Sequence, residues 1–227
     1  MIKVLYQDNH VIAVNKNSGE LTQPDASDEP ALEQKVAHYL KIEGNKPGDA
    51  FVGVVHRIDK PVSGVVLMAK TSKALVRLNE QLKNKEFKKL YWAIVEQKPK
   101  AKLATLVHHI DRSKHTSKSV AHDRPTKESK EAVLKYTQIG EYDKYALLEV
   151  ELVTGRHHQI RAQLSAIGCP IVGDVKYGAK SIGKAYGIAL HSRQLTFMHP
   201  VQKVVVNVVA PVPQNDGPWK LFNHQTK

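Results

Sequence analysis

Residues 56–70 read HRIDKPVSGVVLMAK. The stretch places one carboxylate, Asp59, between two cations, Arg57 and Lys60, and a turn containing Pro61 then leads into an apolar run. These features predict a buried strand that begins just after the turn. Neighbouring positive charge favours the ionised carboxylate, which suits a nucleophile or a proton acceptor. The alternative interpretation of Asp59 is a structural salt bridge or a turn-capping aspartate.

A second stretch, residues 154–178, reads TGRHHQIRAQLSAIGCPIVGDVKYG. Together, the two stretches closely resemble the RluA-type pseudouridine synthases. That family shows an HRLDxxTSG block, followed by a TGRxHQIRxxL block that ends in GxPIxGDxxYG. Both blocks stand here in the order of the family, and the resemblance extends from about residue 4 to about residue 210. It is therefore specific enough to guide the interpretation of individual residues.

The resemblance implies an α+β fold. We expect the pseudouridine synthase fold, with a central, mixed but largely antiparallel β-sheet flanked by helices and a basic active-site cleft. Residues 1–227 are expected to form a single catalytic domain, without the N-terminal accessory RNA-binding domain that many relatives carry. The reaction consumes nothing, so no cofactor and no metal are expected.

The resemblance also assigns roles to residues. Asp59 is the catalytic carboxylate, and Arg161 is the arginine that pairs with it. Tyr91 stands in KLYWA, which resembles the KxYxA block of the family, and would contact the base. Arg57 would fill the space of the displaced nucleotide or hold a phosphate, whereas Asp174 is expected to pin its turn. Without the resemblance, Tyr91 reads as an interior strand residue and Arg161 as a surface arginine.

The sequence departs from the family pattern in the turn after Asp59. Val62 stands where the family commonly has a threonine, and we therefore expect a turn with fewer hydrogen bonds. Ile58 replaces a usual leucine and keeps its volume.

The net charge indicates a polyanionic partner. Lysine and arginine number 34 against 22 acidic residues, which gives +12 and a pI near 9.6. RNA, as rRNA or tRNA, is favoured over a membrane surface, because no basic amphipathic helix with a bulky apolar face stands out. A merely basic soluble enzyme is the alternative. The expected RNA contacts are Arg57, Arg156, His157, Lys114 and Lys118.

Residues 110–130 are rich in serine, threonine, lysine and histidine. They read either as a solvated loop between two strands or as a loop that grips phosphates. Periodicity and turn residues predict the regular elements. The predicted strands are 4–6, 11–14, 65–69, 87–95, 131–139, 145–153, 188–197 and 201–209. The predicted helices are 31–40, one that begins at Thr71 or Ser72, and one capped by Thr154.

Several classes of protein are disfavoured. Cys169 is the one cysteine, so an intrachain disulfide is impossible, and it reads as a buried spacer before Pro170. Residues 178–185 nearly spell a phosphate-binding P-loop, but Ala185 replaces the serine or threonine that would hold Mg²⁺. Adjacent histidines lack the spacing of a metal pair. No signal peptide or membrane span is recognisable, so we expect a cytoplasmic protein, and a monomer.

Isomerisation of uridine to pseudouridine in RNA is the function that these residues favour. The competing hypothesis is a non-catalytic RNA-binding or RNA-chaperone protein on the same fold. A nucleoside hydrolase is a third possibility, which would need a second carboxylate near Asp59.

Overall fold

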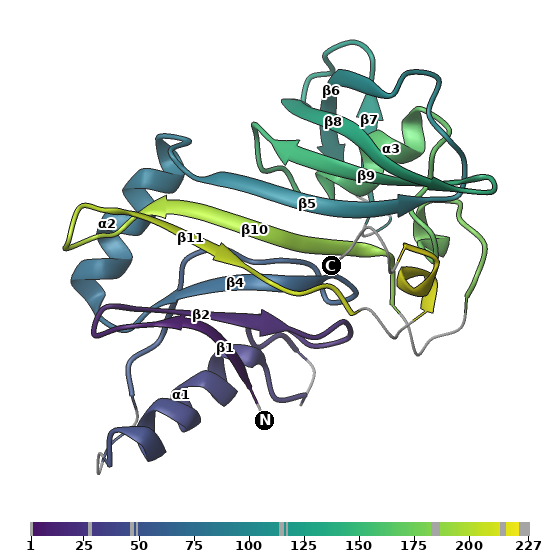
Figure 1. Ribbon diagram of the computed structural model, residues 1–227. Coiled ribbons are helices and arrows are strands. Elements are labelled where there is room, and N and C mark those ends of the chain that lie inside the picture. Colours follow the sequence, from purple (N-terminus) through teal and green to yellow (C-terminus); the bar gives the residue numbers. More distant parts are fainter. Residues whose placement is uncertain are drawn as a thin grey trace. The chain divides into compact units, whose positions relative to one another are not determined.

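The computed structural model describes residues 2–26, 29–45, 48, 50–113, 116, 118–182, 187–213 and 217–222. The chain forms two compact units. The first consists of Met1–Lys88 and Ser192–Pro211, and the second of Lys89–His191 and Val212–Lys227. Both combine strands with helices, as the α+β prediction requires (Figure 1).

The first unit contains a sheet in the order β1-β2-β4-β10, with β3 paired to β4 and β11 paired to β10. Its strands are β1 (Lys3–Gln7), β2 (Val11–Lys16), β3 (Gly53–Val54), β4 (Ser63–Ala69), β10 (Leu190–Met198) and β11 (Val205–Val209). β1 pairs antiparallel with β2, and β10 with β11. The strand predictions for residues 4–6, 11–14, 65–69 and 188–197 are confirmed, whereas the predicted strand 201–209 begins only at Val205, after a turn.

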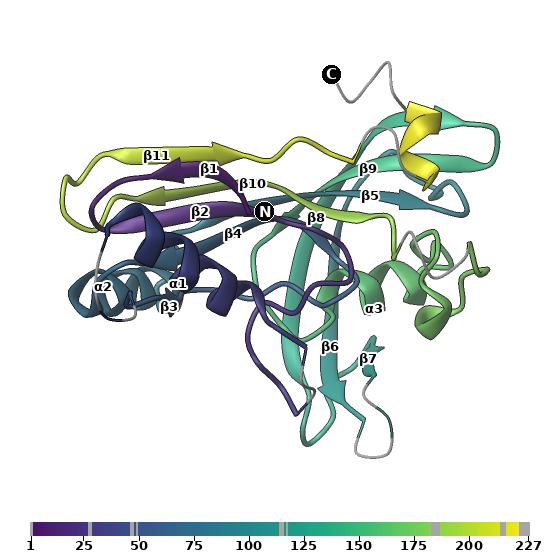
Figure 2. The ribbon, with the colours of Figure 1, turned by 90° about the horizontal axis from the view of Figure 1, so that it is seen from below.

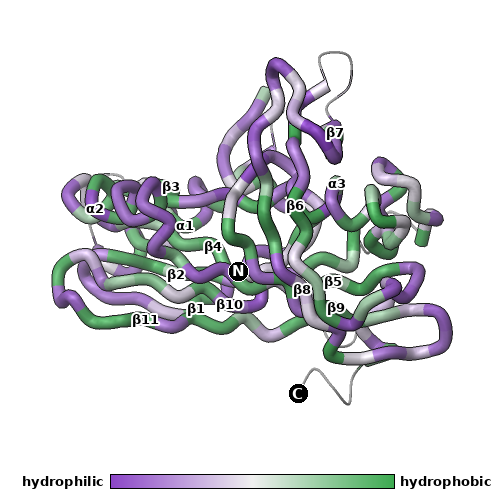
Figure 3. Tube along the Cα trace, turned by 90° about the horizontal axis from the view of Figure 1, so that it is seen from above, coloured by the Kyte–Doolittle hydropathy of each residue, from purple (hydrophilic) through white to green (hydrophobic). Residues whose placement is uncertain are grey.

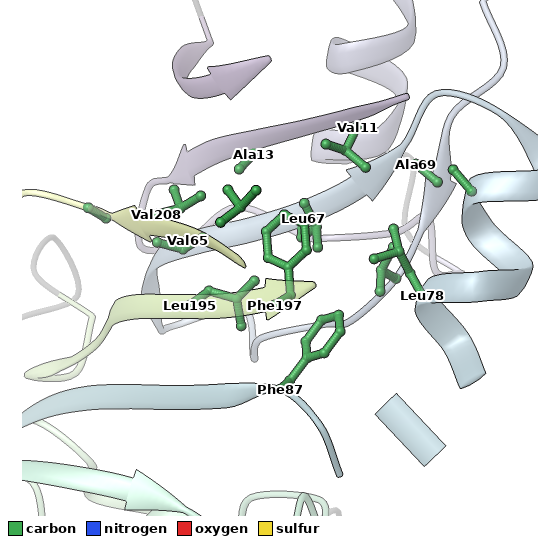
Figure 4. Packing of buried hydrophobic residues seen from close by; sticks show 14 residues of the cluster. Val11, Ala13, Val65, Leu67, Ala69, Leu78, Phe87, Leu195, Phe197 and Val208 are labelled. Carbon is green, nitrogen blue, oxygen red and sulfur yellow. The ribbon is translucent and has the colours of Figure 1, made fainter. Parts of the chain in front are cut away.

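β4 is the strand that the opening stretch predicts. All seven of its residues are buried, as expected of a continuous apolar run covered on both faces. Its side chains join the hydrophobic cluster in Figure 4, where the rings of Phe87 and Phe197 lie 5.7 Å apart. Gly64 has φ +114°, and a Cβ there would lie 2.2 Å from the carbonyl oxygen of Ser192. Only glycine allows β10 to approach the start of β4 so closely.

Two helices cover one face of this sheet, α1 (Leu32–Glu43) and α2 (Ser72–Lys83) (Figure 2). Thr71 caps α2, since its side chain accepts a hydrogen bond from the Ala74 N–H. Gln81 then fastens α2 to the end of β10. Its amide donates to the Met198 carbonyl at 2.9 Å and accepts from the Met198 N–H at 3.1 Å. The prediction of both helices is confirmed.

The second unit contains a sheet in the order β5-β9-β8-β6-β7, whose strand pairs are antiparallel. Its strands are β5 (Lys88–Val95), β6 (Leu103–Arg112), β7 (Ser119–His122), β8 (Lys130–Tyr142) and β9 (Tyr145–Leu152). Its helical elements are α3 (Gln159–Ala166) and the short 3₁₀ helices η1 (Val175–Tyr177) and η3 (Gly217–Phe222). α3 packs against β6 and β7.

Residues 110–130 are not one continuous loop, as the composition suggested. β6 extends to Arg112, and β7 pairs with it antiparallel, with Arg112 opposite Ser119. The polar residues enter strands because Ile110 and Ser119 are buried, so their backbone groups need partners. Ile110 is paired with β7 and β8, whereas the Ser119 N–H donates to the Tyr177 hydroxyl at 2.8 Å. The turn that joins β7 to β8, residues 123–129, is mainly hydrophilic (Figure 3).

The prediction that Thr154 caps the third helix is also wrong. α3 begins at Gln159, five residues after Thr154. The Thr154 hydroxyl instead accepts a hydrogen bond from the Val133 N–H in β8 and donates one to the side chain of Gln159, each at 2.9 Å. Gln159 also accepts from the Arg156 N–H at 2.9 Å. These contacts tie the turn to β8 before the helix starts.

Four smaller observations complete the fold. Cys169 is buried, as predicted, and burial raises the pKa of its thiol. Trp219 and Phe222 of η3 are buried as well. The P-loop-like segment overlaps residues 183–186, which lie outside the described residues. Among the helices of the described ranges, none is long and apolar enough to cross a membrane.

Candidate active site

Asp59 lies in a turn that a distant segment clamps. Residues 16–22, at the end of β2 and just beyond it, donate hydrogen bonds to the turn's backbone carbonyls. The donors and acceptors are the Thr22 hydroxyl to Ile58 at 2.9 Å, the Lys16 ammonium to Lys60 at 3.0 Å, the Gly19 N–H to Lys60 at 2.8 Å, and the Ser18 hydroxyl to Pro61 at 2.8 Å. The Val62 N–H closes the turn on the Asp59 carbonyl at 2.9 Å. The backbone of Asp59 is therefore held firmly although Val62 has no hydroxyl.

Lys16 is the most unusual member of the clamp. Its side chain is fully buried, and its ammonium group also donates to the carbonyls of Asn17 at 3.0 Å and Glu20 at 2.7 Å. Burial lowers the pKa of Lys16 to about 7, against the opposing attraction of the Glu20 and Asp59 carboxylates. Lys16 thus combines a structural role with an electrostatic effect on Asp59.

The sequence interpretation missed Lys16. The available signal was its position in β2, where it shares the inward parity of Ile12 and Val14. A lysine at an inward strand position is rarely buried unless its charge has partners. The sequence interpretation treated Lys16 only as part of a turn, because the carbonyl oxygens that accept its hydrogen bonds lie up to 44 positions away.

The other charges near the Asp59 turn are more exposed. Arg57 is exposed and Asp59 is half-buried, whereas Ile58 between them is buried and anchors the turn. Lys60 pairs with Glu29 at 2.6 Å at the surface, where such a pair contributes little stability. Arg57 and Asp59 therefore reach solvent on either side of a fixed apolar anchor.

Tyr91 is a buried residue of β5, opposite Val150 of β9. Successive strand residues point to opposite faces, so Tyr91 and Trp92 face different ways. The Trp92 indole donates to Glu149 at 3.3 Å. The burial of Tyr91 fits an interior strand tyrosine and also a ring at the edge of a dry site.

Arg161 and Asp174 form a buried, bidentate ion pair. The Nε of Arg161 donates to Oδ2 of Asp174 at 2.7 Å, and Nη2 donates to Oδ1 at 2.8 Å. The side chains are 5% and 1% exposed. The Asp174 backbone also accepts from the Tyr177 N–H at 2.8 Å. The prediction that Asp174 pins its turn is confirmed, and Arg161 is a buried residue, not a surface arginine.

Tyr177 connects this ion pair with the β6–β7 hairpin. The Arg161 guanidinium lies 5.0 Å from the centre of the Tyr177 ring. The Tyr177 hydroxyl accepts a hydrogen bond from the Ser119 N–H at 2.8 Å and lies 2.9 Å from Nδ1 of His158. Burial and nearby positive charge lower the pKa of His158 to about 3. Neutral His158 and Tyr177 therefore share one hydrogen bond at neutral pH.

The remaining expected RNA contacts have different surroundings. Arg156 is exposed, and its Nε donates to the Glu131 carbonyl at 2.9 Å. His157 is exposed, and its Nδ1 lies 2.9 Å from the Ser119 hydroxyl. Lys118 is exposed, and Lys114 lies outside the described residues.

The predicted site residues divide between the two units. Arg57 and Asp59 belong to the first unit, and Tyr91, Arg161 and the residues around α3 belong to the second. The pairing of Arg161 with Asp59 stays a prediction. Within the described part of the chain, no three histidine, cysteine or acidic side chains are grouped as metal ligands would be.

The comparisons with known proteins decide the family. The profile described as RNA pseudouridylate synthase matches residues 10–166. The chain belongs to this family. It is therefore a member of a family of RNA-modifying isomerases, and the resemblance read from residues 56–70 and 154–178 is confirmed.

Curated relatives and solved structures agree with this assignment. An uncharacterised RNA pseudouridine synthase of Synechocystis sp. is 33% identical over 217 residues, which cover 93% of this chain and 66% of the relative. The ribosomal large subunit pseudouridine synthase D of Borreliella burgdorferi is 35% identical over 201 residues, covering 86% of this chain and 60% of the relative. The chain thus spans about two thirds of the length of these relatives.

The same fold occurs in human RNA Pseudouridylate Synthase Domain Containing 4, with a TM-score of 0.79 and 22% identity over 99% of this chain and 92% of that chain. It also occurs in human RNA Pseudouridylate Synthase Domain Containing 1, with a TM-score of 0.75 and 21% identity over 94% of this chain and 84% of that chain. The predicted pseudouridine synthase fold is therefore confirmed.

Proposed function

We propose that this chain isomerises uridine to pseudouridine in RNA, with Asp59 as the reacting carboxylate. The observation that carries the proposal is the clamped turn, which holds the aspartate of the family's HRxD block half-buried beside Lys16. A carboxylate fixed in this way is preorganised for attack or for proton transfer.

The reaction balances without a co-substrate. The bond from C1′ to N1 breaks, and a bond from C1′ to C5 of the same base forms. C5 loses one proton and N1 gains one, so the product is an isomer of the substrate. The target nucleotide must leave its stack, which costs roughly a few kcal/mol. Asp59 would attack C1′ or C6, or would accept a proton.

Other residues would support this step. Arg161 would orient Asp59 and keep it ionised, and Tyr91 would meet the base. Arg57, adjacent to Asp59 and exposed, would fill the vacated space or hold a phosphate. Arg156, His157, Lys114 and Lys118 would contact RNA as cations or hydrogen-bond donors.

Glu20 is the candidate for a second catalytic acid, because the carboxylates of Glu20 and Asp59 both attract the Lys16 ammonium group. A hydrolase would need this acid protonated to donate to the leaving base. Although burial opposes it, hydrogen bonds from the Lys35 ammonium at 2.7 Å and the Asn17 N–H at 2.9 Å lower the pKa of Glu20. Glu20 is therefore an anion at neutral pH, which favours isomerisation over hydrolysis.

Ribosomal RNA or transfer RNA is the proposed substrate. The charge of +12 suits either polyanion. The names of relatives from Borreliella burgdorferi and Xylella fastidiosa refer to the ribosomal large subunit. Large-subunit rRNA is therefore the first RNA to test.

The decisive experiment expresses the chain in cells that lack their own RluA-type enzymes and maps pseudouridines in rRNA and tRNA. New sites are expected with the natural protein and none with Asp59→Asn. Sites that persist in the variant would remove the assignment of Asp59. No sites with either protein, together with RNA binding, would favour an RNA-binding or chaperone protein. Release of free uracil would indicate a hydrolase.

A further inference from the structure

Cationic side chains from three separate elements converge on His158. Arg112 ends β6, His157 precedes α3, and Lys176 lies in η1. Besides burial, which is the largest cause, four positive groups lower the pKa of His158 to about 3: Arg161, His157, Lys176 and Arg112. These groups therefore lie close enough to act on one imidazole, which stays neutral at pH 7.

Fixed contacts hold these elements together. Ser119 stands opposite Arg112 across the hairpin. Its hydroxyl lies 2.9 Å from Nδ1 of His157, and its N–H donates to the Tyr177 hydroxyl at 2.8 Å. Tyr177 in turn contacts His158 at 2.9 Å, and the rings of His157 and His158 stack with centroids 3.8 Å apart. The positions of the three backbones are thus set before any ligand arrives.

Two nearby carboxylates, Asp174 and Asp111, already have partners of their own. Both oxygens of Asp174 are bonded to Arg161, and this carboxylate is 1% exposed. Asp111 lies next to Arg112 on β6 but bonds to His122 at 3.1 Å, and strand neighbours face opposite ways. The first turn of α3, whose residues are all described, contains no acid.

We propose that Arg112, His157 and Lys176 form one binding site for a phosphate of the RNA substrate. Arg112 and His157 are exposed and Lys176 is half-buried, so their polar groups can meet a ligand from solvent. A contact of this kind positions RNA without reading its sequence. The inference rests on the proposed function, because it takes RNA as the ligand.

The test measures the affinity of the whole chain for a fluorescent 20-nucleotide single-stranded RNA between about 50 and 300 mM salt. Each neutralised phosphate contributes about 0.7 to the slope of log K against log salt. The double variant Arg112→Gln/Lys176→Gln should lose about 0.7 in slope and about fivefold in affinity at 0.1 M salt. Each single variant should lose part of that affinity.

Lys102→Gln is the matched control. Lys102 is also exposed, but it precedes β6 and lies roughly 33 Å from Arg112 along the strand. Lys102→Gln should show the same slope of log K against log salt as the unmodified protein, and so should Lys176→Arg. Equal melting temperatures show that the variants are folded.

The site is refuted if the double variant keeps the natural slope or if Lys102→Gln reproduces the change. It is also refuted if the double variant loses about 1.4 in slope, which indicates two separate phosphates on a diffuse basic surface. Asp59→Asn should bind with the natural slope. If the slope changes as expected but the natural protein forms no pseudouridine, the proposed function fails and the phosphate site stands.

Discussion

The buried pair of Arg161 and Asp174 provides a stability prediction that can be worked out from distances. Asp174→Asn keeps the shape of the side chain and removes its charge, which takes away the anion that the buried guanidinium contacts through two hydrogen bonds. The two hydrogen bonds, at 2.7 and 2.8 Å, each contribute about 1.5–3 kcal/mol because they join charged groups; asparagine can accept only one of them, as a neutral group, and turns an NH₂ donor toward the other. Their sum agrees with the about 3–5 kcal/mol measured when one partner of a buried pair is removed. We expect the free energy of unfolding to fall by about that amount.

Urea unfolding monitored by fluorescence and by circular dichroism measures this loss. The chain should also melt about 10 °C or more lower, given about 2–8 °C per kcal/mol for domains of 60–250 residues. The matched variant Arg161→Met/Asp174→Leu removes both charges and should be more stable than Asp174→Asn, since neither charge of the pair then remains buried.

Two results would refute this reasoning. A loss below about 1 kcal/mol for Asp174→Asn would mean that the pair is not desolvated as its burial indicates. A double variant as unstable as the sum of the single variants would mean that the two side chains are not energetically coupled.

Four further predictions follow from other contacts. Lys16→Met should lower the single-turnover rate at least about tenfold with its melting curve still cooperative, because the Asp59 turn loses a donor; an unchanged rate would exclude a positioning role. Because the pKa of His158 is lowered, the free energy of unfolding should fall as pH falls from about 6.5 toward 3. The variant His158→Asn, whose side chain tolerates φ +52°, should lose less free energy of unfolding between pH 7 and 4.5 than the unmodified protein, as measured by urea unfolding. Asp8 is partly buried, which opposes ionisation, but backbone and side-chain hydrogen bonds lower its pKa. Asp8→Asn should therefore be about 1–3 kcal/mol less stable at pH 7, and this difference should begin to shrink near pH 4 and vanish only below the lowered folded-state pKa. Gly64→Ala should abolish soluble expression or cooperative melting, whereas Gly168→Ala, with φ +76° and open space around a Cβ, should cost only about 1–3 kcal/mol.

Much of the local structure could be predicted from the sequence. The run from Ser63 to Ala69 is apolar enough to be a buried strand, and Thr71 carries the hydroxyl that caps α2. The alternation of Leu148 and Val150 with Glu149 and Glu151 predicts one buried face of β9, and both Leu148 and Val150 are buried. These features depend on residues within about ten positions of one another, so periodicity and turn chemistry suffice.

Long-range contacts explain what the sequence interpretation missed. Thr154 has a hydroxyl that could cap a helix, but that hydroxyl accepts a hydrogen bond from the Val133 N–H, 21 positions earlier, and α3 begins only at Gln159. β7 forms within a polar segment because Ser119 meets Tyr177, 58 positions later.

The sequence alone determined the family and the position of Asp59, because both are written in contiguous motifs whose residue types the chemistry requires. Only the tertiary structure decided how the Asp59 turn is held, that Asp174 contacts Arg161 through two hydrogen bonds, and which basic groups lie around His158. Those features depend on burial and on partners brought together by folding. No local pattern contains that information, since a buried charge is stable only when distant segments supply its hydrogen bonds.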